Sequence, residues 1–221
     1  MDHAARCPEA HPMSFIGNLL SREDRYAALL EAGALEVQAT VRALAQLVTS
    51  PNPAISLAAF VQARAKEQEI KGRIDALLCQ RACGRLDHGD IVALALGLNR
   101  ISKTTRRFAE RHLLCAAQLP AGEFAEQLAM LDEAALTMRM MVAELMSGPK
   151  VAAAKRHNDV LQGIKGKADQ LFTAAVTELY QGREEPMTAI MLRDLYEVLD
   201  RIFDRFRNTG NEILQIVLKQ S

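Results

Sequence analysis

Apolar residues recur at alternating steps of four and three positions through four long segments of this 221-residue chain. These stripes span residues 26–47, 91–108, 124–145 and 192–216. Steps of four and three place the apolar side chains on one face of an α-helix, whereas a half-buried strand requires a period of two. A stripe sustained over several heptads faces a neighbouring helix at a shallow crossing angle, as in coiled coils and antiparallel bundles. The pattern therefore predicts an all-α, elongated antiparallel bundle.

Turn and capping residues divide the chain into six predicted helices. The chain has 35 Ala and 29 Leu, no Trp and only seven Pro, a composition that favours helices over strands. Ser21 followed by Asp24 resembles a capping box, and Pro186 suits the first turn of the last helix. The predicted helices cover about 21–48, 56–83, 87–118, 122–147, 150–181 and 186–218.

The six helices are predicted to form two repeats of three. The stripe at 26–47 recurs at 124–145, 98 positions later (124 minus 26), and the hexamer at 70–75 resembles the one at 164–169. We expect residues 1–13 to be a disordered N-terminal extension and 14–221 one helical domain, with repeat one at about 14–119 and repeat two at about 120–219. The predicted core includes Leu44, Leu98, Leu131 and Leu199.

Charge and motif content exclude several classes of function. The chain has 27 Lys plus Arg and 27 Asp plus Glu, so its net charge gives no reason to expect nucleic-acid binding. There is no apolar run of membrane-spanning length and no secretory signal, so we expect a cytoplasmic protein, at most peripheral to the inner face of the cell membrane. No nucleophile elbow, P-loop, Rossmann fingerprint or zinc-protease helix is present. We therefore expect no enzymatic activity.

Three short motifs, in their order and spacing, resemble a known family. They are the segments 20–26 (LSREDRY), 86–91 (LDHGDI) and 193–200 (RDLYEVLD) followed by Asp204-Arg205. In these the chain is similar, over about 14–219, to the PhoU-like Pit accessory proteins of bacteria and archaea. That family is described as phosphate transport regulators, commonly encoded beside a Pit-type phosphate transporter. The resemblance implies two repeated three-helix bundles and regulation by protein–protein contact with such a transporter.

The resemblance also implies acidic pairs, Glu/Asp-x-x-x-Asp, on the middle and last helix of each repeat, which hold metal ions, iron in some relatives. Carboxylates at i and i+4 share one helix face and supply hard oxygen ligands. In the second helix the register is open between Glu67 with Lys71 and Lys71 with Asp75. The positions at which this chain lacks the matching carboxylate are Lys71, Asn99, Arg100, Lys103 and Lys165.

Three carboxylates remain at the matching positions of the second repeat: Asp169, Asp200 and Asp204. A lysine ammonium only donates hydrogen bonds and repels a metal cation, so Lys165 cannot replace a ligand. We expect that the metal clusters are lost, that no cofactor is needed and that Lys–Asp ion pairs stand in their place. The alternative is a storage or sensor protein that holds iron or another divalent metal on the three carboxylates.

The third predicted helix carries a row of cations: Arg100, Lys103, Arg106, Arg107 and Arg111. A basic helix face can attract phosphate, anionic lipid or an acidic loop of a partner, and it can equally be a solvated face with local salt bridges. The leading hypothesis is a cytoplasmic regulator or adaptor of inorganic phosphate transport that contacts a Pit-type transporter. The alternatives are the metal-binding protein and a purely structural homo-oligomer.

Overall fold

The computed structural model describes residues 22–49, 61–62, 65–66, 68–70, 72–73, 86–148, 150–182 and 185–221. Every regular element within these ranges is helical, which confirms the predicted all-α class. The elements are α1 (Arg22–Thr49), α3 (His88–Cys115), the 3₁₀ turn η2 (Ala116–Gln118), α4 (Ala125–Ser147), α5 (Val151–Tyr180) and α6 (Pro186–Lys219). The described positions between 61 and 73 are also helical.

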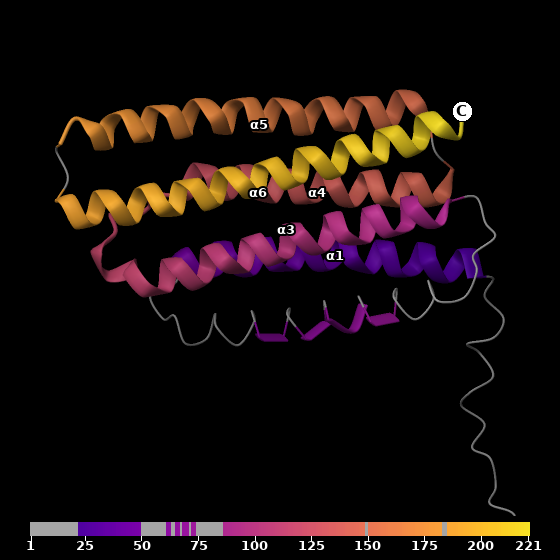
Figure 1. Cartoon of the computed structure of the whole chain (residues 1–221), viewed down its shortest axis with the longest axis horizontal. Coiled ribbons are helices and arrows are strands. Elements are labelled where there is room, and N and C mark those ends of the chain that lie inside the picture. Colours follow the sequence, from indigo (N-terminus) through magenta and orange to yellow (C-terminus); the bar gives the residue numbers. More distant parts are fainter. Residues whose placement is uncertain are drawn as a thin grey trace, which may run out of the picture.

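The long helices lie side by side along one axis and form an elongated bundle (Figure 1). Helix α1 packs on α3 and α4, and α6 packs on the same two helices, so these four form a closed ring around the core. Helix α5 lies outside the ring, against α6 and α4. Helices α4 and α6 each contact three other helices: α4 contacts α1, α5 and α6, and α6 contacts α3, α4 and α5.

The apolar stripes form the core as the sequence predicts. The side chains of Leu44, Leu98, Leu131 and Leu199 are all buried, with at most 3% of their surface exposed. Burial of each contributes roughly 1.5–3 kcal/mol relative to exposure. The stripe residues are buried from Ile91 to Phe108 in α3 and from Leu192 to Ile216 in α6.

Helix ends fall close to the predicted positions, with one difference. Helix α6 begins at Pro186, and the Glu185 carboxylate accepts hydrogen bonds from the backbone N–H groups of Met187 and Thr188 at 2.9 and 3.1 Å. The third helix was predicted to continue to 118, but its last turn tightens into η2 and α4 starts only at Ala125. Gly122, with φ of 78°, supplies the left-handed turn between them.

Several predictions concern residues that the structure does not describe. The disordered extension (1–13), the capping residue Ser21 and most of the predicted second helix lie outside the described ranges. The division into two three-helix repeats therefore stays a prediction.

A close approach of Gly97 on α3 to the Thr209 side chain on α6 gives a testable prediction. A Cβ atom added at Gly97 would lie 2.8 Å from Thr209 Oγ1 and 3.0 Å from Thr209 Cγ2. The Thr209 hydroxyl donates to the Arg205 carbonyl, so this buried side chain cannot easily turn away. We expect Gly97→Ala to lower the free energy of unfolding in urea by roughly 1–2 kcal/mol, because overpacking exceeds the gain in helix propensity.

The matched control is Gly163 on α5, where an added Cβ would meet no heavy atom within 4 Å. There we expect Gly163→Ala to raise the free energy of unfolding by up to about 1 kcal/mol, through helix propensity alone. Equal effects at the two glycines would contradict the close α3–α6 contact.

Candidate functional site

A single buried lysine joins α5 to α6. The Lys165 ammonium donates to Asp169, one turn along α5, and to Asp200 Oδ1 on α6 at 2.7 Å. It also forms an ion pair with Asp204 Oδ1 at 3.5 Å. Only 7% of the Lys165 side chain is exposed. The structure thus brings together all four second-repeat residues that the sequence singled out. We call Lys165, Asp169, Asp200 and Asp204 the lysine cluster.

The electrostatics of the lysine cluster favour a permanent ammonium. Burial by itself lowers the pKa of Lys165, because it removes water from the charge. Hydrogen bonds to Asp169 and Asp200 and the charges of Asp200 and Asp204 outweigh that effect, so the pKa of Lys165 is raised above its ordinary value. Arg207 adds a second cation, with its guanidinium 3.0 Å from Asp204 Oδ1. The Lys165 side chain therefore keeps its positive charge at neutral pH.

The lysine cluster does not fit a metal ion. The ammonium lies at the point where the three carboxylates converge, and it offers no lone pair to a cation. Within the described ranges, no group of three or more His, Cys, Asp or Glu side chains is arranged to hold a metal ion.

The structure describes only some of the matching positions in the predicted first repeat. Lys71 and both of its proposed partners, Glu67 and Asp75, lie outside the described residues. On α3, Asn99 is half-buried, whereas Arg100 and Lys103 are exposed. The two α3 cations do not form an ion pair with any described carboxylate, unlike Lys165 in the other half of the chain.

The cations of α3 line a groove rather than a flat face. A cavity of about 700 Å³ lies along the α3–α6 seam, and Gln68 borders it from the predicted second helix. We call it the cationic groove. Among the described residues, its charged lining comprises six cations and one acid: Arg100, Lys103, Arg106, Arg107, Arg201, Arg205 and Glu110.

Two of the six cations come from α6 and were not among the predicted surface residues. Arg201 and Arg205 are one turn apart on α6 and exposed, so their i, i+4 spacing was the available signal. Conversely, the predicted residue Arg111 is not in the lining and lies 3.9 Å from Asp194 of α6. Arg106 is half-buried, and its charge acts on the buried Glu36 carboxyl.

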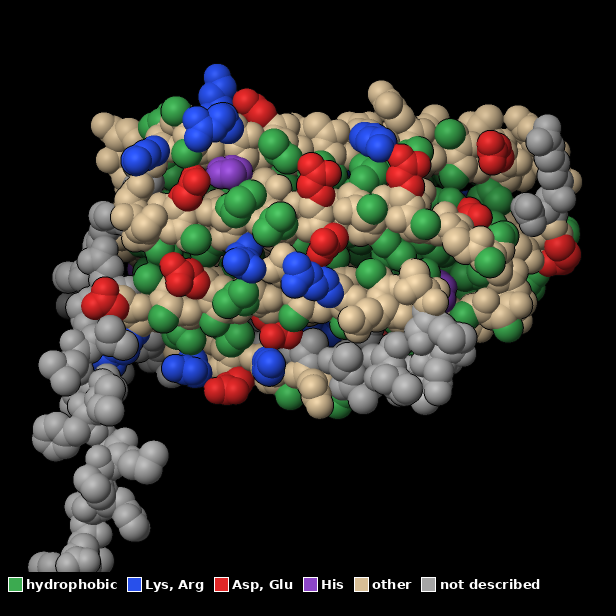
Figure 2. Space-filling view, turned by 180° about the vertical axis from the view of Figure 1, so that it is seen from behind, with side chains coloured by type: hydrophobic (Ala, Val, Ile, Leu, Met, Phe, Trp, Pro, Cys, Tyr) green, Lys and Arg blue, Asp and Glu red, His purple; other side chains and the backbone are tan. Residues whose placement is uncertain are grey.

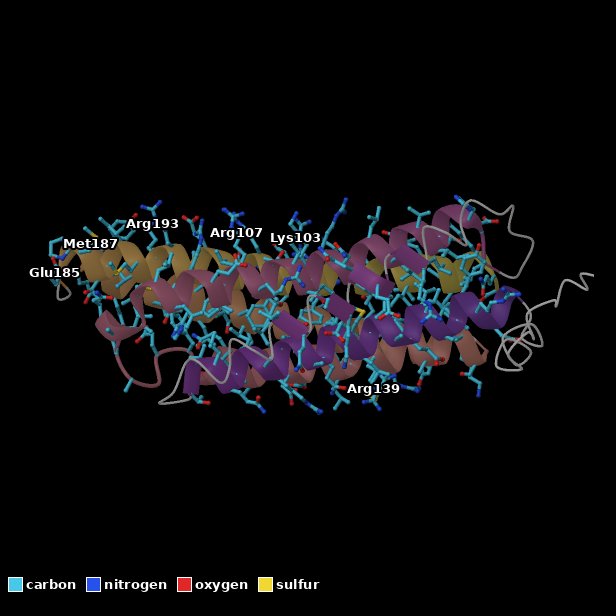
Figure 3. All side chains as sticks on the ribbon, turned by 90° about the horizontal axis from the view of Figure 1, so that it is seen from below. Lys103, Arg107, Arg139, Glu185, Met187 and Arg193 are labelled. Atoms are coloured by element: carbon cyan, nitrogen blue, oxygen red, sulfur yellow. The ribbon has the colours of Figure 1, made fainter. Side chains whose placement is uncertain are left out.

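The charges of the groove are concentrated on one side of the molecule. Lys103, Arg107 and Arg193 point toward the same edge of the bundle, whereas Arg139 points toward the opposite edge (Figure 3). On the reverse face, Lys and Arg side chains alternate with Asp and Glu (Figure 2). Ion pairs also link helices elsewhere in the bundle, such as Arg42 with Asp132 and Lys167 with Glu126.

Helices long and apolar enough to cross a membrane are absent from the described part of the chain. No family model matches the sequence. A curated relative from Rhizobium meliloti (strain 1021), named "Putative pit accessory protein", is 24% identical to this chain over 211 residues. The alignment covers 91% of this chain and 96% of the relative, so the likeness extends over nearly the whole bundle. Its name agrees with the family that the sequence motifs resemble.

Proposed function

We propose that this protein is a non-enzymatic regulator of inorganic phosphate transport that acts by direct contact with a Pit-type transporter. The observation that carries the proposal is the relative named as a Pit accessory protein, which aligns over 91% of the chain. The residue motifs at 86–91 and 193–205 lie at the start of α3 and within α6, the two helices that border the cationic groove.

The exposed cations of α3 are the proposed docking surface. Lys103 and Arg107 are exposed, lie one turn apart and have no carboxylate partner among the described residues. Unpaired surface cations raise the rate and specificity of association with an acidic partner, such as a loop of a transporter at the membrane surface. In this proposal the protein works without a metal, because the lysine cluster supplies its own cation.

Reversing two of these charges should weaken docking. We expect Lys103→Glu with Arg107→Glu to reduce co-purification of the protein with a tagged Pit-type transporter from its host by about tenfold at low salt, since like charges would then face each other. Capture of the wild type should itself decrease as salt is raised. We choose Lys103 over Arg106 because a glutamate at 106 would lie beside Glu36 and disturb the fold.

Lys155→Glu with Arg156→Glu is the matched control, since both side chains are exposed on α5 and away from the groove. This pair should leave capture within about twofold of the wild type. Unchanged capture of the Lys103/Arg107 variant would exclude the α3 surface as the docking site. Failure of the wild type to co-purify with the transporter would exclude the partnership.

A further inference from the structure

The seam between α3 and α6 has an uneven distribution of charge. At one end, the Lys219 ammonium lies 2.7 Å from Asp90 Oδ1, and at the other end Arg111 pairs with Asp194. These two contacts show that the helices are antiparallel and that acids and bases are matched across both ends. Between these two ion pairs the charges are not matched, because both helices present cations to the same groove.

The middle of the seam places like charges opposite one another. In the register set by the end pairs, the α3 segment 100–107 faces the α6 segment 198–205. Arg100, Lys103 and Arg107 thus share the groove with Arg201 and Arg205. Like charges that share a groove repel one another and so lower the stability of the folded protein. Packing of α3 against α6 does not itself require cations on both helices.

Most of these cations are not neutralised by a described acid. Arg201 is the exception, with its guanidinium 3.5 Å from Glu197 Oε2. Asp200 and Asp204 are adjacent to Arg201 and Arg205 in sequence, but they point to the α5 side of α6 and are bound by Lys165. Glu110 is the one acidic residue of the described lining. Arg100, Lys103, Arg107 and Arg205 form no ion pair with a described carboxylate. The described lining of the groove therefore keeps a net positive charge.

From these observations we propose that the cationic groove binds a small anion that carries several linked phosphate groups. Five of its six cations are arginines, whose planar guanidinium groups donate two parallel hydrogen bonds to a phosphate. The α3 cations span positions 100 to 107, about 10 Å along the helix, which exceeds the reach of one phosphate group. Val198 is the only apolar side chain of the described lining, so an occupant would be held by charge and hydrogen bonds rather than by apolar contacts. The groove shares Lys103 and Arg107 with the proposed docking surface, but the inference does not require the transporter partnership.

Isothermal titration calorimetry of the purified full-length protein tests the proposal, with inorganic tripolyphosphate as the probe. We expect tripolyphosphate to bind at least about tenfold more tightly than orthophosphate or a pentaglutamate peptide, with an affinity that falls as salt rises. ATP distinguishes the two sources of the same chemistry. Binding of ATP as tight as that of tripolyphosphate identifies the triphosphate group of a nucleotide as sufficient, whereas weaker binding identifies a free inorganic chain.

Variants in the two walls of the groove locate the site. Arg107→Gln with Arg205→Gln should weaken tripolyphosphate binding by at least about tenfold, because each residue contributes charge-assisted hydrogen bonds. Arg107→Lys, which keeps the charge and loses the planar fork, should give a smaller loss. The control pair Lys155→Gln with Arg156→Gln should bind within about twofold of the wild type, and urea unfolding confirms that each variant is folded.

Three results would overturn the proposal. The first is that the wild type does not bind tripolyphosphate. The second is that pentaglutamate binds as tightly as tripolyphosphate, which would assign the groove to an acidic peptide. The third is that the control pair loses as much affinity as the Arg107/Arg205 variant. A wild type that binds tripolyphosphate but captures no transporter would leave this inference standing and remove only the proposed partnership.

Discussion

Replacing Lys165 by methionine should lower the free energy of unfolding by roughly 3 kcal/mol at pH 7, measured by urea denaturation. Methionine keeps the length and apolar stem of lysine, so the loss reports the charge rather than a cavity. The ammonium is buried and holds Asp169, Asp200 and Asp204 from two helices, and its removal leaves three carboxylates facing one another. Partial exposure of these carboxylates keeps the expected loss at the lower end of the range for buried ion pairs.

The pH dependence of stability should differ between the wild type and the Lys165→Met variant. Because the pKa of Lys165 is raised in the folded state, its contribution in the wild type is complete below the ordinary lysine pKa and is lost as pH rises through the folded value. The methionine variant lacks this group. Its deficit relative to the wild type should therefore be constant below the ordinary lysine pKa and should shrink as pH rises through the folded value.

Lys155→Met is the control, since Lys155 is exposed on the same helix. We expect its effect to be within about 0.5 kcal/mol of zero at every pH. If Lys165→Met were as mild as the control, the lysine cluster would be a surface ion pair with no part in holding α5 against α6.

The sequence alone predicted the helical architecture because the relevant signal is local and repeated. Alternating steps of four and three place Leu44, Leu98, Leu131 and Leu199 on buried faces whatever the detailed packing, and the structure buries all four. The end of the third helix was less predictable. Its last turn tightens to 3₁₀ geometry, a left-handed turn at Gly122 follows, and the apolar spacing does not mark that change.

Contacts between helices were only partly predictable. The pair of Lys165 and Asp169 follows from i, i+4 spacing on one helix. The addition of Asp200 and Asp204 depends on the register of α5 against α6, which buried contacts such as that of Gly210 with Leu161 determine. The cationic groove has the same origin. Arg201 and Arg205 join the α3 cations only because α6 runs antiparallel to α3 in the register that Gly97 and Thr209 allow.

We expect the charge of the lysine cluster to determine also how the protein responds to metal. The wild type, expressed in medium supplemented with iron and zinc, should contain well under one equivalent of metal by elemental analysis, since Lys165 repels cations from the three carboxylates. Stoichiometric iron that disappears on Asp200→Ala or Asp204→Ala would instead favour the storage or sensor function.

Lys165→Glu should convert the lysine cluster into a metal site. The change replaces the central cation by a fourth carboxylate beside Asp169, Asp200 and Asp204, which is an oxygen-rich set suited to Mn²⁺ or iron. Without metal the variant should be less stable than Lys165→Met, because four like charges converge. With Mn²⁺ at about one hundred times its dissociation constant, binding should restore about 2.7 kcal/mol and raise the melting temperature by about 5–10 °C.

Two controls separate a specific site from general binding of metal to acidic surfaces. The melting temperature of the wild type and of Lys155→Glu should not change with Mn²⁺, and the increase in the Lys165→Glu variant should disappear when Asp200 and Asp204 are both changed to Asn. An increase of equal size in Lys155→Glu would show that the effect comes from surface charge. A folded Lys165→Glu variant that binds no Mn²⁺ would show that the three aspartates are arranged for an ammonium alone, and that substitution of one residue does not restore a metal centre.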